Sequence, residues 1–172
     1  KPWVKTSLAP GSKVVIDYLE KELSYENYIP MKDRGIDLIS VKKNNFYYIQ
    51  VKTSKFQKGS YFWFDLILEK MIYSKNTIYI FNCFVNERRT FMGKKRNLLV
   101  IPSNDIKNWI NKKQIHITAK KKSSGNGTNK AIRFFVYPDF KNKKWIYKGN
   151  SKIKEKLIDL TKYWNNKKVF KS

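Results

Sequence analysis

The chain is poor in the residues that cross-link small proteins or bind zinc. Its 172 residues include one cysteine, Cys83, and one histidine, His116. A single cysteine excludes an internal disulfide, and these two side chains are too few for a zinc site of ordinary ligand count. We therefore expect a protein of the reducing cytoplasm.

Long apolar runs are also missing. No stretch approaches the roughly 18 apolar residues of a membrane-spanning helix, and residues 1–12 lack the apolar segment of a signal peptide. The sequence thus predicts a soluble intracellular protein with no membrane partner.

Acidic residues are scarce relative to basic ones. The chain has 37 Lys and Arg against 13 Asp and Glu, for a formal net charge of +24. Such an imbalance favours a polyanionic partner, and nucleic acid is the first candidate. Compositional drift in an AT-rich genome would enrich Lys, Asn and Ile without selection for binding. Drift accounts for some lysines, but not for the scarcity of acids.

Apolar and aromatic side chains are plentiful. They make up 41% and 16% of the chain, more than a disordered sequence contains. The length fits one domain, which we take as residues 1–172. We expect the α/β class, with a mixed central β-sheet flanked by helices.

The periodicity of apolar residues predicts the order of the elements. Helices are expected over residues 12–25, 103–110 and 151–164, and strands over 36–41, 46–52, 77–85, 97–102, 115–118 and 132–137. Candidate caps are Ser12, Ser151, and either Ser103 or Asn104. Residues 42–45 form a hairpin turn and 28–34 a connector. Residues 61–73 have mixed periodicity, which we interpret as a short strand entering a helix near Asp65.

The first two strands carry the residues suited to chemistry. Asp37 is set into an apolar strand, where a buried carboxylate is costly without a cation or partner. Gln50 and Lys52 are two residues apart and share a sheet face, whereas Val51 points to the other. Hydrolysis of a phosphodiester needs a held cation and an activated water. The Gln50 side chain and the Val51 carbonyl offer oxygen ligands for Mg²⁺ or Mn²⁺, and Lys52 would orient the water.

This pattern resembles the PD-(D/E)xK nuclease superfamily, which includes restriction enzymes, Holliday junction resolvases and some homing endonucleases. The resemblance rests on Gly-x-Asp at residues 35–37, followed thirteen positions later by Gln-Val-Lys at 50–52. It implies a metal-dependent DNA nuclease with a restriction-endonuclease-like core over about residues 12–110 and a basic extension over 111–172. Asp37 and Gln50 would bind the metal, and Lys52 would be the motif lysine. Gln50 replaces the usual acid, and an amide gives a less anionic metal shell.

The resemblance also implies a glutamate from the first helix. The candidates are Asp17, Glu20 and Glu22. Helix geometry favours Glu20, which borders the apolar stripe, as a catalytic residue and metal ligand. The family acid usually lies nearer the helix start, where this chain has Ser12 and Lys13.

Two basic segments are the expected nucleic-acid contacts, although a solvated surface is the ordinary interpretation of any single lysine. They contain Arg88, Arg89, Lys94, Lys95 and Arg96 in the first segment, and Lys120, Lys121 and Lys122 in the second. Trp63, Trp109 and Trp145 are interpreted as core residues, and none is assigned to base readout. His116 is interpreted as a structural residue.

The expected function is therefore a Mg²⁺- or Mn²⁺-dependent DNA endonuclease of the restriction, homing or junction-resolving type. Cleavage of both strands of a duplex would usually need a homodimer. Two alternatives remain open at this point. One is a catalytically inactive nucleic-acid-binding module on the same fold, and the other is an unrelated RNA-binding protein.

Overall fold

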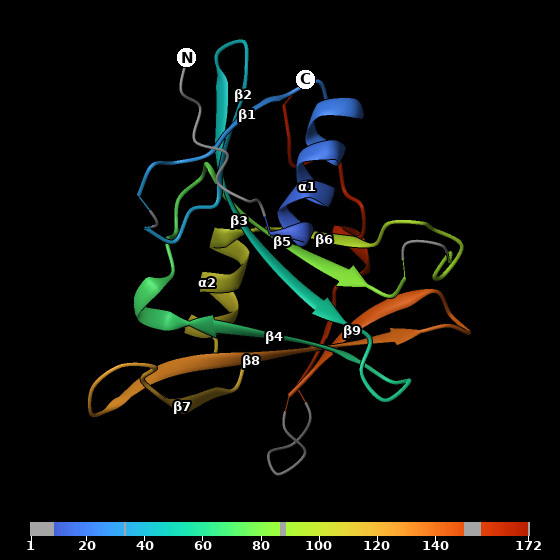
Figure 1. Ribbon diagram of the computed structural model, residues 1–172. Helices are drawn as coiled ribbons and strands as arrows, with labels where there is room; N and C mark the ends of the chain where they lie inside the picture. Colours follow the sequence, from blue (N-terminus) through green and yellow to red (C-terminus); the bar gives the residue numbers. More distant parts are fainter. Residues whose placement is uncertain (1–8, 33, 87–88, 150–155, 172) are drawn as a thin grey trace.

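A computed structural model shows two β-sheets packed against each other (Figure 1). One helix lies on the outer side of the first sheet. The structure describes residues 9–32, 34–86, 89–149 and 156–171. No helix within these ranges is long and apolar enough to cross a membrane.

The first sheet is mixed and has the order β1-β2-β3-β5-β6 among the described residues. Its strands are β1 (Glu26–Tyr28), β2 (Leu38–Lys42), β3 (Asn45–Lys55), β5 (Thr77–Phe84) and β6 (Leu98–Pro102). The β3 and β5 strands are parallel and the other neighbours antiparallel. Lys42 pairs with Asn45, so Lys43 and Asn44 form a two-residue turn in which Lys43 has a φ of 53°. This confirms the expected mixed sheet and hairpin.

The second sheet is antiparallel and combines a strand from the middle of the chain with strands from its last third. It contains β4 (Phe62–Ile67), β7 (Ile117–Lys121), β8 (Thr128–Asp139), β9 (Lys144–Lys148) and β10 (Leu157–Asp159). β8 pairs with β4 along one edge and with β7 and β9 along the other. Residues after 111 are thus built into the same body as those before it.

Two apolar cores hold these layers together. The helix α1 (Pro10–Lys21) buries Val15 and Leu19 against the face of the first sheet that carries Ile49 and Ile80. The opposite face, with Phe81 on β5, packs on the second sheet and on α2 (Ser103–Asn111). α1 therefore covers one face of the mixed sheet, and the second sheet together with α2 covers the other, where helices alone were expected.

Several expected elements differ in type. Residues 62–67 form β4 and pass straight through Asp65, and only the short 3₁₀ turn η1 (Leu68–Lys70) follows. The expected last helix is wrong where it can be judged. Residues 157–159 form β10, and 161–163 form the 3₁₀ turn η2 (Thr161–Tyr163). Residues 151–155, including the candidate cap Ser151, lie outside the described residues. β1 precedes the expected connector and overlaps it only at Tyr28, and β9 was not expected at all.

The helix boundaries differ because the expected caps are not caps. α1 starts at Pro10 with Ala9 as its N-cap, and it ends at Lys21, so Ser12 lies inside it and Tyr25 beyond it. Pro102 precedes α2, and the Ser103 hydroxyl donates to the backbone oxygen of Ser74 at 2.9 Å instead of capping the helix. Pro10 suits the first position of α1 because its φ is fixed near the helical value and its missing N–H would have no helical partner there.

Candidate active site

A cleft of about 660 Å³ opens where the start of β2 and the middle of β3 meet β4 and η1. Its polar lining comes from the first sheet, the segment before β2, and η1, whereas β4 contributes Leu66 and Ile67. The lining residues include Arg34, Asp37, Gln50, Val51, Lys52, Glu69, Lys70 and Tyr79. The strand pairing thus brings the three motif side chains to one cleft, as the sequence predicts.

The Asp37 carboxylate is fixed by β3. Its backbone N–H donates to the Ile49 oxygen at 2.9 Å, which extends the β2–β3 pairing to this residue. Its Oδ2 accepts the Val51 N–H at 2.7 Å and the Gln50 Nε2 at 2.9 Å. These two hydrogen bonds hold the Asp37 carboxyl in a fixed position at the wall of the cleft.

Gly35 shapes the entry to the cleft. It has a φ of +81°, and a Cβ built on it would lie 2.9 Å from the Lys70 backbone oxygen. Only glycine combines this left-handed conformation with so close an approach of two chain segments. The Gly-x-Asp pattern therefore allows η1 to fold against the start of β2.

Gln50 has one amide atom in use and one without a partner. Its Nε2 donates to Asp37, whereas its Oε1 is buried with no hydrogen-bond partner among the described residues. A buried amide oxygen without a donor is costly. Amide and carboxylate oxygens are the ligands that Mg²⁺ and Mn²⁺ take, so the donor chemistry here fits such an ion.

Glu69 is a second carboxylate in the cleft that the sequence patterns did not single out. Its Oε1 accepts the Lys130 N–H at 3.0 Å. This hydrogen bond from β8 is the main cause that lowers the pKa of Glu69, and the charges of Lys130 and Lys122 add to it. Glu69 is therefore ionised at neutral pH and faces the same space as Asp37.

Glu20 is not part of the cleft. It is exposed on α1 and is absent from the residues that line the site. α1 packs on the sheet face that carries Ile49, whereas Gln50 and Lys52 point to the other face. The expected helix acid thus lies on the wrong side of the sheet for this site.

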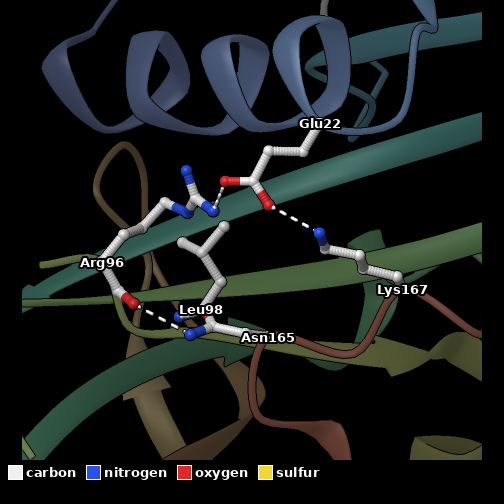
Figure 2. Close-up of polar contacts among 5 residues, drawn as sticks. All are labelled: Glu22, Arg96, Leu98, Asn165 and Lys167. Atoms are coloured by element: carbon white, nitrogen blue, oxygen red, sulfur yellow. Dashed lines mark hydrogen bonds and ion pairs between the residues drawn. The ribbon is translucent and has the colours of Figure 1, made fainter. Parts of the chain in front are cut away.

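Two of the expected phosphate-binding cations are engaged within the protein. Arg96 pairs with Glu22, and its guanidinium lies 4.6 Å from the centre of the Tyr18 ring. Figure 2 shows Glu22 between Arg96 and Lys167, whose Nζ lies 3.1 Å from the carboxylate. Lys120 pairs with Asp65. Both cations therefore have structural partners, which reduces their availability for phosphate.

The other predicted cations are surface side chains. Lys94, Lys95, Lys121 and Lys122 are exposed, as is Arg89. Arg89, Lys95 and Arg96 line a second hollow of about 300 Å³ beside the start of α1. Arg88 lies outside the described residues. For the exposed members, the role of phosphate contact stays a prediction.

No protein-family model matches the chain, and no solved structure matches it. Two curated enzymes share a short segment with it. Aconitate hydratase A of Thermus thermophilus is 95% identical over 20 residues, and aconitate hydratase A of Streptomyces viridochromogenes is 86% identical over 21 residues. Each match covers 12% of this chain and 2% of the aconitase, so the likeness is that of a short segment and not of a domain.

Proposed function

We propose that the chain is a Mg²⁺- or Mn²⁺-dependent DNA endonuclease of the PD-(D/E)xK type. The observation that carries the proposal is the Asp37 carboxylate, held by the Val51 N–H and the Gln50 amide in a cleft that Lys52 also lines. The antiparallel β2–β3 pair followed by the parallel β3–β5 pair supports a restriction-endonuclease-like core. The net charge of +24 supports a polyanionic substrate.

The cleft residues divide the work of phosphodiester hydrolysis. Asp37 and Gln50 would hold the metal ion through their side-chain oxygens, and Glu69 adds negative charge on the far wall. A bound divalent cation neutralises charge that develops on the phosphate and acidifies a water molecule. Lys52 orients the attacking water and stabilises the anionic transition state. Exposed lysines and Arg89 contact phosphates and fix the position of the DNA.

Cleavage by matched variants tests the proposal. Wild type, Asp37→Asn and Lys52→Ala are incubated with plasmid, branched DNA and RNA, with and without Mg²⁺ or Mn²⁺. Asn keeps an acceptor for the Val51 N–H, so Asp37→Asn should fold while losing the charge. We expect both variants to lose cleavage by about 100-fold or more and to keep salt-sensitive DNA binding.

Two control variants separate the cleft from its surroundings. Lys55→Ala removes the same charge from the exposed end of β3, and Glu20→Gln removes the helix acid that lies away from the cleft. Both should cleave as wild type does. Equal losses in Lys52→Ala and Lys55→Ala would contradict a specific role for Lys52.

The second candidate is a DNA-binding module without turnover on the same fold. Two observations favour it. The neutral Gln50 amide donates to Asp37, and the described residues contain no group of three or more His, Cys, Asp or Glu placed to hold a metal. Metal-independent DNA binding without cleavage by wild type would support this candidate, and a preference for RNA over DNA at equal salt would point to the RNA-binding alternative.

A further inference from the structure

The outward face of the second sheet carries a row of aromatic side chains. On β4 and β8, Phe62, Phe64 and Phe134 point inward and are buried. Their neighbours alternate outward, because successive residues of a strand point to opposite faces. Trp63 is the cross-strand partner of Phe135. Trp63 is 41% exposed, although the sequence predicts a core residue at this position.

These outward aromatics form one continuous surface, which we call the aromatic face. Tyr61 lies 5.6 Å from the ring of Phe135 and 5.6 Å from that of Tyr137. Adjacent rings at this spacing keep each other in place. The aromatic face thus consists of Tyr61, Trp63, Phe135 and Tyr137.

Cations interleave with the aromatic face. The Lys148 Nζ lies 4.9 Å above the Tyr137 ring. Arg133 is exposed two residues before Phe135 on β8, and its cross-strand partner is Asp65, which pairs with Lys120. Positive charge beside flat apolar rings is complementary to a strand with a phosphate backbone and unpaired bases.

Neither helix covers the aromatic face. α1 packs on the first sheet, and Trp109 of α2 stacks on Phe134 from the inward side of β8. Figure 1 shows both helices on the same side of the β4–β8–β7 layer. The described strands and helices therefore leave the outward side of β4 and β8 open.

The aromatic face leads into the cleft. Trp63, Asp65 and Ile67 alternate along the outward side of β4, and Ile67 also lines the cleft. At the other end of β4, the Trp63 N–H donates to the Ser54 hydroxyl on β3 at 2.9 Å. A strand that lay along β4 would thus pass from the aromatic face to the site of Asp37 and Lys52.

We propose that the aromatic face binds a single-stranded segment of the DNA substrate by base stacking and delivers its backbone to the cleft. The delivery of the backbone to the cleft rests on the proposed nuclease function. It narrows the substrate to DNA with unpaired bases beside the cleaved phosphate. Stacking tolerates any base, because every base has a π-face, so the face contributes affinity for single strands and not sequence choice.

Binding without metal tests the aromatic face separately from cleavage. Fluorescence anisotropy is measured in EDTA with one labelled sequence as single-stranded DNA, duplex DNA and single-stranded RNA. Trp63→Leu keeps apolar bulk without the π-face, and Trp63→Phe keeps a ring. We expect about tenfold weaker single-stranded DNA binding for Trp63→Leu and near-wild-type binding for Trp63→Phe. Tyr28→Leu, at an aromatic residue 54% exposed on β1, should change nothing.

Three results would overturn the proposal. The first is unchanged single-stranded DNA binding by Trp63→Leu, and the second is an equal loss of affinity for duplex DNA in that variant. The third is a preference of the wild type for RNA over DNA of more than about tenfold, since stacking alone does not separate the two. If Trp63→Leu lowers the thermal midpoint, Phe135→Leu repeats the test from β8. The two proposals can fail separately. If these variants lose single-strand binding but the wild type cleaves no substrate, the proposal for the aromatic face holds and the proposed nuclease function is wrong.

Discussion

At Gln50 an amide lies beside the Asp37 carboxylate, where an acid would add a further negative charge to the cleft. Its Nε2 donates to Asp37 Oδ2, a contact that an ionised glutamate cannot make. The amide therefore stabilises the Asp37 carboxylate by a hydrogen bond, without a cation. An acid at the same position would place two like charges side by side, which raises the pKa of one of them.

Gln50→Glu should make folding depend on metal. We expect the free energy of unfolding in EDTA to fall by about 1.5 to 3 kcal/mol, because a hydrogen bond to a charged group is lost and repulsion replaces it. Added Mn²⁺ should restore stability, since the oxygen set then carries one more negative charge. Thermal denaturation with and without Mn²⁺ measures both effects.

Gln57→Glu is the matched control, because it adds the same charge just beyond β3 and outside the cleft. It should show little dependence on Mn²⁺. A stability of Gln50→Glu that does not change between EDTA and Mn²⁺ would mean that these oxygens bind no cation.

The sequence located one wall of the cleft and missed the other. Asp37, Gln50 and Lys52 follow from alternation along two adjacent strands, which is local information. Glu69 could not be found this way, because it reaches the cleft through the contact of η1 with Gly35 and the Lys130 N–H of β8, 61 residues away in the sequence. Glu20 failed for the related reason that helix periodicity shows which side is apolar, but not which sheet face the helix covers.

At the scale of elements, the packing of α1 on the first sheet depends on Gly11, near the start of the helix. A Cβ built on Gly11 would lie 1.8 Å from Thr53 Oγ1 and 2.9 Å from Thr53 Cβ. The backbone of α1 at Gly11 therefore lies directly against the Thr53 side chain of β3, next to the strand residues that carry the motif. Thr53 is the residue directly after Lys52, so a shift of α1 would be transmitted to the cleft.

Gly11→Ala should destabilise the protein although alanine is the better helix former. In a helix without contacts the change would stabilise by up to about 1 kcal/mol. Here we expect a loss of about 1 to 3 kcal/mol in the free energy of unfolding, because the added methyl overlaps Thr53. Urea denaturation of Gly11→Ala, Thr53→Ala and the double variant measures the coupling.

In the Thr53→Ala background the added methyl should cost less, since Oγ1 and Cγ2 are gone and only the Cβ contact remains. Gly149→Ala serves as the control, because among the described residues its Cβ would meet only the Tyr147 hydroxyl, at 3.7 Å. Equal stability of wild type and Gly11→Ala would show that α1 shifts without penalty.

Tertiary packing decided the element types that periodicity got wrong. The strands β5 and β6 were predictable because their apolar runs are short and bounded, with Pro102 at the end of β6. Residues 62–67 alternate, but the apolar residues after them continued the pattern into a false helix. Leu157 and Leu160 have helical spacing, yet Leu157 is 57% exposed and Leu160 is buried beside Trp145, a pattern set by pairing with β9.

At the scale of the molecule, a polar cluster ties the C-terminal segment to α1 and β6. The Glu22 carboxylate pairs with both Arg96 and Lys167 (Figure 2). Asn165 continues the cluster, because its side chain accepts the Leu98 N–H at 2.9 Å and donates to the Arg96 oxygen at 3.0 Å. Beyond it, Phe170 packs in the same core as Tyr25 and Tyr47. The chain end is thus part of the body that supports the cleft.

Glu22 should make this attachment sensitive to acid. Burial alone would raise the pKa of Glu22, but hydrogen bonds and charge from Arg96 and Lys167 outweigh it and lower the pKa below its ordinary value of 4.5. A carboxyl with a lowered pKa in the folded state contributes stability above its unfolded pKa, and that stability is lost as the pH falls through the folded value. The side chain is 32% exposed, so solvent screens the pairs.

Glu22→Gln should therefore lower the free energy of unfolding at pH 7 by roughly 0.5 to 1 kcal/mol, and the difference from wild type should shrink as the pH falls below about 4.5. Urea denaturation at pH 7, 5 and 3 measures this, with Glu20→Gln as the control on the same helix. Glu20 has no ion pair among those described, so its variant should match wild type throughout. A Glu22→Gln deficit that stays constant from pH 7 to pH 3 would mean that its shape, and not its charge, holds the C-terminal segment in place.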